Sequence, residues 1–426
     1  MRTSTTLLLA TLATLPGCGC DTVPADAVLD CQASQVLPAA VQTDILFVID
    51  DSGSMSQEQA NLRDNLAAFV DALVASPVQN DFRIGVTSTA VEGYTVNGAT
   101  PQAYPVGGPA AGKPYPDGAL VAVRQRAGGA ITPGDLVYDL AADPATLGWG
   151  GARILDKGDG SAAALAALAR DFKANVQLGT GGSGKEQPLR AARLALTDRL
   201  LDANAGFLRP GARLAVIVVT DEDDCSDTAD PQRTTTDDQC HDLARKFADP
   251  PVMDRVEDFA SFLFGPVDGE LRDVVVGVIA GFSPSHGDPA TLVPALCSTA
   301  GAGQAFATAD RYAALQTNLG GARMRLGSIC DASFADTLRG FAEILMPSTL
   351  PLAGVPADWR MLLVALSRAG GEQVRCVVAA EGTAGQAAAG AVYSPPRFGR
   401  PAQLTFQNAC TLGLGDRIDV RLVCAG

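Results

Sequence analysis

The chain has 426 residues, of which 47% are hydrophobic and 19% are charged, a composition typical of a globular protein with a buried core. Its 47 acidic and 32 basic residues give a formal net charge of -15, which would repel a phosphate backbone and argues against nucleic-acid binding. The ten cysteines include no C-x-x-C pair, so disulfides in an oxidising compartment are a better interpretation than a zinc site.

An export signal is predicted at the N-terminus. The apolar run from Leu7 to Leu15 is about half the roughly 20 residues that span a bilayer, which indicates a signal peptide over residues 1–17. The run ends in Leu15-Pro16-Gly17-Cys18, which resembles the cleavage box of bacterial lipoproteins. Cys18 would then carry lipid and anchor the protein at the outer membrane or cell surface, with residues 18–43 as a tether. The alternative is an ordinary cleaved signal with Cys18 in a disulfide.

Strands alternate with helices from residue 44 to about residue 347. Buried strands are predicted at 45–49, 82–86, 214–219 and 274–279, and helical spacing of apolar residues recurs at 62–73, 165–172, 189–200 and 334–345. Ser56 and Gln59 form a capping-box pattern at the start of the first helix. The alternation predicts an α/β fold with a doubly wound, mainly parallel sheet and right-handed crossovers.

Two parts of the chain interrupt or follow this pattern. Residues from about 90 to 160 are rich in Gly and Pro and are interpreted as a long surface insertion, with one extended segment at 119–123. After residue 347 the periodicity becomes close to two, which predicts a small antiparallel β module over 351–426. Its expected strands are 361–366, 373–378, 403–406 and 417–423.

The loop after the first predicted strand carries the chemistry. Asp50, Ser52 and Ser54 stand at alternate positions beyond the carboxyl end of that strand, where open α/β sheets bind ligands. A carboxylate and two hydroxyls are hard oxygen ligands, which favour Mg²⁺, Mn²⁺ or Ca²⁺ over zinc. The alternative is that these residues cap the following helix, because Ser and Asp also favour that position.

The pattern Asp50, Ser52, Ser54 resembles the Asp-x-Ser-x-Ser start of the metal-ion-dependent adhesion site of von Willebrand factor type A (VWA) domains. In that family a threonine from a later loop and an aspartate after a central strand complete the site, and the matching residues are Thr180 and Asp221. The resemblance covers roughly residues 44 to 346. It implies a Rossmann-like VWA domain whose divalent cation, Mg²⁺ before Mn²⁺ or Ca²⁺, accepts a carboxylate from a ligand.

One departure concerns the residues after the last aspartate. The family often has glycine there, whereas this chain has Glu222-Asp223-Asp224, which leaves open which carboxylate faces the metal. A rival pattern is the phosphate-binding loop, because Gly179 to Lys185 satisfies G-x-x-x-x-G-K. That motif requires Ser or Thr after the lysine, and Glu186 stands in its place, so an ATPase is disfavoured.

The cysteines and the acidic loop bear on the same region. From Asp221 to Asp242 nine residues are acidic and only one is basic, so this loop either attracts cations or a basic partner, or is a solvated loop held by a disulfide. That disulfide would join Cys225 and Cys240, and a second would join Cys297 and Cys330. With Cys18 lipidated, nine cysteines remain, which is an odd number. The five that belong to neither expected disulfide therefore cannot all pair within one chain; they are Cys20, Cys31, Cys376, Cys410 and Cys424.

The functional hypothesis is a surface lipoprotein that binds an extracellular protein or glycan through the metal site. No catalytic residue is predicted. The two histidines, His241 and His286, have no partner at helical ligand spacing, which disfavours histidine metal sites, and no paired acid and base is evident for proton transfer. The alternative is a metal-dependent hydrolase of phosphate or acyl esters at the same site.

Overall fold

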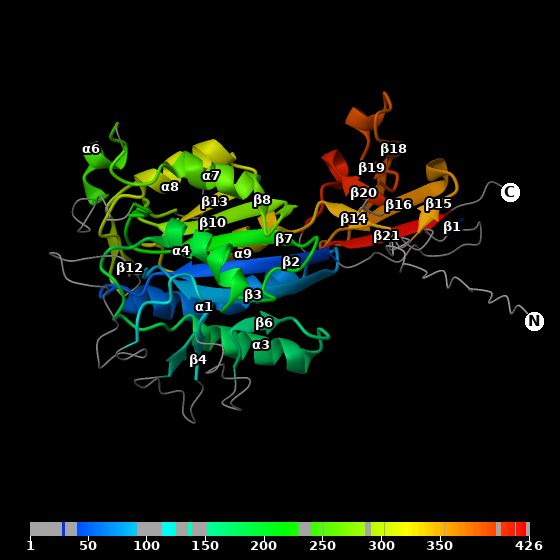
Figure 1. Ribbon diagram of the computed structural model, residues 1–426. Coiled ribbons are helices and arrows are strands. Elements are labelled where there is room, and N and C mark those ends of the chain that lie inside the picture. Colours follow the sequence, from blue (N-terminus) through cyan, green and yellow to red (C-terminus); the bar gives the residue numbers. More distant parts are fainter. Residues whose placement is uncertain are drawn as a thin grey trace, which may run out of the picture.

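The structure, a computed structural model, has a six-stranded central sheet (Figure 1). It describes residues 28–29, 41–91, 113–124, 135–138, 151–229, 240–249, 251–285, 291–301, 303–352, 354–397, 402–413 and 415–422. The strand order is β13-β10-β7-β2-β3-β6, and all neighbours are parallel except the edge pair β3 and β6. The bounds are β2 Val41–Ile49, β3 Asn80–Ser88, β6 Ile154–Asp156, β7 Arg213–Val219, β10 Val274–Ala280 and β13 Met324–Ser328. The predicted α/β architecture with a mostly parallel sheet is confirmed at this level.

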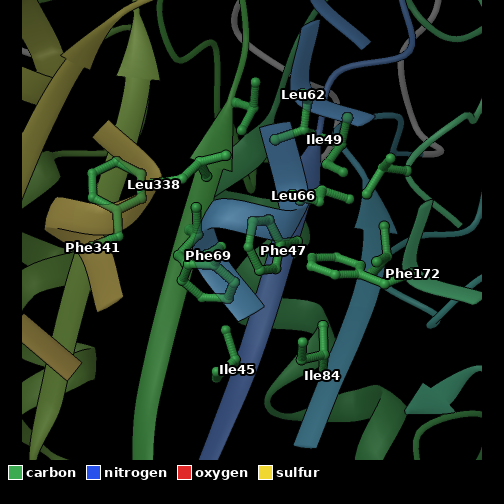
Figure 2. Packing of buried hydrophobic residues seen from close by; sticks show 14 of the residues in the cluster. Ile45, Phe47, Ile49, Leu62, Leu66, Phe69, Ile84, Phe172, Leu338 and Phe341 are labelled. Atoms are coloured by element: carbon green, nitrogen blue, oxygen red, sulfur yellow. The ribbon is translucent and has the colours of Figure 1, made fainter. Parts of the chain in front are cut away.

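Helices cover both faces of the sheet, which explains why its strands are apolar without alternation. Along β2, Phe47 points into one hydrophobic cluster and Val48 into the other, and Figure 2 shows Phe47 against Phe69 and Phe172. On the Phe47 face lie α1 Ser56–Val74, α3 Ala162–Asn175 and α9 Ala335–Leu345. On the Val48 face lie α4 Pro188–Ala195, α7 Val256–Phe264 and α8 Asp310–Leu319.

The order of the strands creates a topological switch point at the carboxyl ends of β2 and β7. The chain passes from β2 to β3 on one side, and later returns on the other side of β2 with β7, β10 and β13. Ile49 and Val219 are register partners at the ends of β2 and β7. Ligands of open α/β sheets bind at such a switch point, because the segments that follow the two neighbouring strands leave the carboxyl edge of the sheet in opposite directions.

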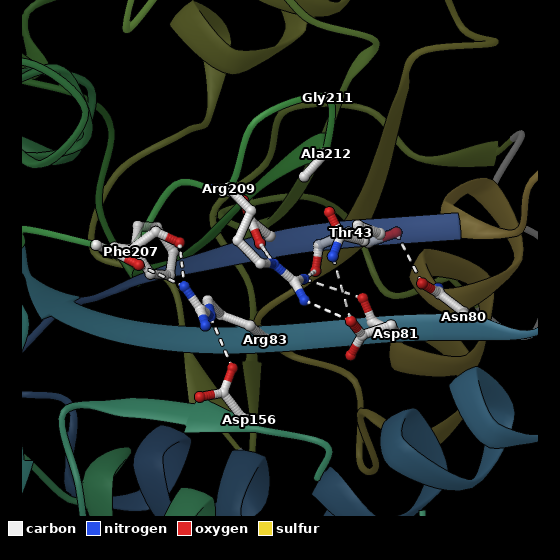
Figure 3. Close-up of polar contacts among 12 residues, drawn as sticks. Thr43, Asn80, Asp81, Arg83, Asp156, Phe207, Arg209, Gly211 and Ala212 are labelled. Carbon is white, nitrogen blue, oxygen red and sulfur yellow. Dashed lines mark hydrogen bonds and ion pairs between the residues drawn. The ribbon is translucent and has the colours of Figure 1, made fainter. Parts of the chain in front are cut away.

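The opposite, amino-terminal edge of the sheet is closed by an ion-pair network (Figure 3). The Arg209 guanidinium lies 2.7 Å from the buried Asp44 carboxylate and 2.9 Å from the Asp81 carboxylate. Burial raises the pKa of Asp44, and the hydrogen bonds and charge of Arg209 oppose that rise. The charges at this edge are therefore compensated within the protein.

Residues 349 to 422 form two small, mostly antiparallel sheets, which agrees at a coarse level with the predicted antiparallel β module. One has the order β14-β20-β19-β18, in which β18 and β19 are parallel, and the other has the order β17-β16-β21. The bounds are β14 Thr349–Pro351, β16 Leu362–Ser367, β17 Gln373–Cys376, β18 Val378–Ala380, β19 Ala391–Ser394, β20 Gln403–Phe406 and β21 Arg417–Leu422. Their hydrophobic cluster includes Val78 and contacts Val41, so the two sheets pack beside the amino-terminal edge of the central sheet.

Two boundary predictions were wrong. β2 begins at Val41, and β1 Val28–Leu29 pairs with β15 Val355–Pro356, so part of the predicted tether is bound to the folded protein. Within the predicted surface insertion, β6 joins the central sheet, and β4 Ala122–Val123 pairs with β5 Leu136–Val137 in a buried position. Their apolar side chains extend the core. The sequence did not indicate this burial, because the surrounding segment is rich in Gly and Pro and was interpreted as a surface insertion.

Other predictions fall partly or wholly outside the described residues. These include the signal peptide, Cys18, most of residues 18–43, Cys20, Cys31, Cys424 and His286. Strand β13 and helix α8 were not predicted; β13 is an edge strand in which Arg325 and Gly327 break the apolar run. Within the described part of the chain, no helix is both long and apolar enough to cross a membrane.

Candidate metal centre

Asp50 directly follows β2, and hydrogen bonds to the end of the neighbouring strand β7 hold it in place. Its backbone N–H donates to the Val219 carbonyl at 2.9 Å. Its carboxylate accepts the Ser52 N–H at 2.8 Å on one oxygen and the Thr220 hydroxyl at 2.7 Å on the other. The side chain is fully buried. Asp50 is therefore fixed in orientation before any ligand binds.

The two predicted serine ligands lie together beyond Asp50. The hydroxyls of Ser52 and Ser54 are 3.1 Å apart, and Ser54 is half-buried while Gly53 is exposed, so the loop opens to solvent. Helix α1 starts at Ser56 after Met55, which makes no side-chain cap. The alternative that this loop caps the helix is therefore wrong.

Gln59 has a different role from the capping box expected in the sequence. Its side-chain amide donates to the Asp50 carbonyl at 2.9 Å and to the Gly179 carbonyl at 2.8 Å. Its side-chain oxygen accepts the Gly179 N–H at 3.2 Å. One buried side chain thus joins the loop of Asp50 to the loop that contains Thr180.

The loop around Thr180 also rests directly on the first loop. The Gly182 N–H donates to the Asp51 carbonyl at 2.7 Å, and a Cβ atom at position 182 would lie 2.1 Å from the Asp51 carboxylate. Only glycine permits this approach. The structure therefore brings the predicted loop to the site, with Thr180 exposed at its rim.

Asp221 is the strongest indication of a cation. It follows β7, is fully buried, and neither of its carboxylate oxygens has a hydrogen-bond partner among the described residues. Burial raises its pKa to about 7; the Ser54 hydroxyl opposes the rise, and the charges of Glu222 and Glu58 add to it. Burial and the charge of Asp221 likewise raise the pKa of Asp50 well above its usual value.

These residues fit a hard divalent cation. Two buried carboxylates that repel each other are costly unless a positive charge lies between them, and a buried polar group without a partner is rare in native proteins. The additional donors are hydroxyl oxygens, which suit Mg²⁺, Mn²⁺ or Ca²⁺. Asp50, Ser52, Ser54 and Asp221 would hold the cation, and Thr180 lies at the open side.

Two buried cationic side chains form ion pairs with two of the aspartates that follow Asp221. The Asp223 carboxylate lies 2.8 Å from the Lys246 ammonium, and the Asp224 carboxylate lies 2.8 Å from the Arg311 guanidinium, with all four side chains buried. These two aspartates are neutralised within the protein, so they are not part of a solvated loop. Of the three aspartates at positions 221, 223 and 224, Asp221 is the one without a described cationic partner.

Lys185 does not serve a phosphate-binding loop. Its side chain is fully buried, and burial lowers its pKa to about 8 although the charge of Asp227 opposes the change. A phosphate-binding lysine must instead reach a ligand in an open loop. The geometry agrees with the absence of Ser or Thr at position 186 in disfavouring an ATPase.

Sequence reasoning did not single out Glu58 or Glu186, and it did not connect His241 with Glu222. The His241 imidazole Nε2 lies 3.2 Å from the Glu222 carboxylate, and Glu186 completes a group whose ligating atoms all lie within 4.8 Å of one another. The sequence argument considered partners of His241 at helical spacing, whereas these carboxylates come from distant segments. A signal was present: His241 directly follows Cys240, which was expected to bond to Cys225.

The structure forms the two expected disulfides, Cys225–Cys240 and Cys297–Cys330. A third disulfide joins Cys376 and Cys410 in the C-terminal sheets. This pairing resolves two of the five cysteines that the sequence left unassigned.

The metal-stripped protein is expected to gain stability as the pH falls from about 7.5 to about 5.5. The raised folded-state pKa of Asp221, about 7, exceeds the unfolded value of about 3.9, so the folded state takes up the proton first. This contribution is fully present below the unfolded pKa and is lost as the pH rises through about 7. Urea unfolding at the two pH values measures it.

Asp221→Asn is the control for this pH effect, and it should show a smaller change because position 221 no longer titrates. Saturating Mg²⁺ should remove the effect, since the cation displaces the proton. A wild-type protein that loses stability on acidification in metal-free buffer would contradict the assignment.

No protein-family profile matches this chain, and no curated protein matches it either. Among solved structures, proximal thread matrix protein 1 from the mussel byssus is 10% identical with a TM-score of 0.32, covering 80% of this chain and 52% of its own. The open conformation of the pilus adhesin SpaC from Lactobacillus rhamnosus GG is 10% identical with a TM-score of 0.36, covering 92% of this chain and 39% of its own. The chain thus spans about half of the first of these proteins and about two fifths of the second, and such distant likeness carries no argument about function.

Proposed function

We propose that this chain is an exported VWA-type adhesion protein that binds an extracellular protein or glycan through a divalent cation. Asp50, Ser52, Ser54, Thr180 and Asp221 hold the cation, with Mg²⁺ as the preferred ion. A carboxylate of the partner fills the coordination position on the solvent side. The observation that carries the proposal is the buried, unpartnered carboxylate of Asp221 beside the Ser54 hydroxyl, at the switch point of the sheet.

The coordination preference of the ion supports binding of a carboxylate. The proposed ligands include two carboxylates, from Asp50 and Asp221, and two neutral serine hydroxyls. Mg²⁺ takes an octahedral set of oxygen ligands, so positions remain open toward the exposed residues Gly53 and Thr180. A carboxylate oxygen of the partner would fill one of these positions.

Mn²⁺ tests this function directly, because a bound paramagnetic ion speeds the relaxation of exchanging water protons. We expect wild-type protein to bind Mn²⁺ and enhance relaxation, and a glutamate-containing peptide to lower the enhancement by displacing bound water. The same peptide with glutamine should have no effect. Asp221→Asn should lose the enhancement, and equal responses to the two peptides would contradict carboxylate capture.

A hydrolase is the second candidate, and one observation favours it. Glu186 groups with Glu222 and His241, and it interacts with Asp50, whose charge adds to the effect of burial in raising the pKa of Glu186. These side chains are proton-transfer groups of the kind that the sequence did not reveal. Turnover of p-nitrophenyl phosphate or p-nitrophenyl acetate by the Mg²⁺-loaded protein, lost in His241→Gln, would favour this function over adhesion.

Anchoring through the N-terminus is part of the proposal. Cys18 is expected to be the first residue of the mature protein and to carry lipid, because the short apolar run ends at Leu15-Pro16-Gly17-Cys18. Mass spectrometry of the N-terminal peptide checks this, and Cys18→Ser should release the protein from the membrane fraction. An unmodified mature chain that starts elsewhere would contradict it.

A further inference from the structure

Three side chains from distant segments converge beside the metal centre. Glu186 precedes α4, Glu222 follows β7 and His241 follows the Cys225–Cys240 disulfide. One ligating atom from each lies within 4.8 Å of the others, and His241 Nε2 lies 3.2 Å from the Glu222 carboxylate. Such distances allow all three atoms to bind one ion.

The buried side chain of Glu186 is independent evidence for a cation at this place. Its side chain is fully buried, and neither carboxylate oxygen has a hydrogen-bond partner among the described residues. One of its carboxylate oxygens lies within 4.8 Å of ligating atoms of Glu222 and His241. A buried carboxylate beside a second carboxylate is costly unless a positive charge lies nearby.

We propose that Glu186, Glu222 and His241 form a second cation site, separate from the Asp50–Asp221 site and selective for a first-row transition ion of the Zn²⁺ type. The imidazole decides the class of ion, because nitrogen ligands suit Zn²⁺, whereas Mg²⁺ and Ca²⁺ prefer sets made only of oxygen. Three protein ligands leave further positions for water or a ligand group. The inference does not depend on what binds at the first site.

The surroundings supply an entry path and a means of fixing the ligands. The side chains of His241 and Glu222 are 19% and 11% exposed, so the site is reached from the His241 side. The disulfide partner Cys240 is the neighbour of His241, and Cys225 lies three positions after Glu222. The crosslink therefore holds the imidazole next to the carboxylate.

Calorimetric titration of the tag-free, full chain with Zn²⁺, in a large excess of Mg²⁺ to saturate the first site, tests the proposal. We expect one equivalent of Zn²⁺ to bind. His241→Gln and Glu186→Gln should each weaken binding at least tenfold, since lost ligation or ligand support costs about 10- to 100-fold in metal affinity. Co²⁺ in place of Zn²⁺ should give visible d–d absorption in the wild type and not in His241→Gln.

His286→Gln is the matched control, because His286 is the other histidine of the chain, and it should bind Zn²⁺ like the wild type. The Mg²⁺-dependent thermal shift should persist in all three variants, which shows that each is folded. Failure of the wild type to bind Zn²⁺ would overturn the proposal and leave Glu186 and Glu222 as a proton-sharing pair. Binding that survives in His241→Gln or Glu186→Gln, or that is lost in His286→Gln, would overturn it as well.

Discussion

Replacing Asp221 with asparagine is expected to abolish the stabilisation of the folded protein by Mg²⁺. In the wild type, a cation that binds only the folded state adds about 2.7 kcal/mol to the free energy of unfolding at a hundredfold excess over its dissociation constant. The Asp221 carboxylate is buried and has no hydrogen-bond partner in the described part of the chain, so the substitution removes one of the two charges proposed to hold the ion. Thermal unfolding of metal-stripped protein, with and without Mg²⁺, measures the effect.

The same variant separates metal binding from a structural role. Without metal, Asp221→Asn should be at least as stable as the wild type, because it removes a buried charge that repels Asp50. A structural aspartate would instead lose stability under both conditions. Asp336→Asn is the control, since its side chain is 85% exposed on α9, and it should keep the full response to Mg²⁺. An unchanged Mg²⁺ response in Asp221→Asn would refute the site.

Arg311→Met is expected to lower the free energy of unfolding by about 3–5 kcal/mol, the usual cost of leaving a buried charge without its partner. The Arg311 guanidinium is almost fully buried, lies 2.8 Å from the Asp224 carboxylate and donates to the Asp254 carbonyl at 2.6 Å. Its removal leaves the buried Asp224 carboxylate without a positively charged partner. Urea unfolding with the disulfides intact measures the loss.

Arg339→Met provides a matched control for this substitution. Arg339 also lies at 2.5 Å from an aspartate, but its side chain is 48% exposed and its partner Asp336 is 85% exposed. Such a surface pair contributes at most about 1 kcal/mol. The double variant Arg311→Met/Asp224→Asn should recover part of the stability, because no unpaired charge remains. Equal losses in Arg311→Met and Arg339→Met would contradict the buried-pair assignment.

The sequence by itself determined those features that depend on neighbouring residues. Apolar runs marked β2, β7 and β10, because a strand covered on both faces is apolar at nearly every position, and Phe82, Ile84 and Val86 marked β3. The order of strands and helices then placed the Asp50 loop and Asp221 at the carboxyl ends of parallel strands. Cys225–Cys240 and Cys297–Cys330 were also predictable, since each pair brackets a loop.

Tertiary structure alone decided which polar groups are paired. In the run Asp221 to Asp224 the four acidic residues are alike in the sequence, but Lys246 and Arg311 arrive from later elements and neutralise Asp223 and Asp224. Gln59 likewise has the spacing of a helix cap, yet it bridges two loops that are 120 positions apart in the chain. Ion pairs and hydrogen bonds act over a few ångströms in space, and no local pattern records which distant segment supplies the partner. The fold therefore leaves Asp221 as the aspartate of that run without a described cationic partner and brings His241 to Glu222.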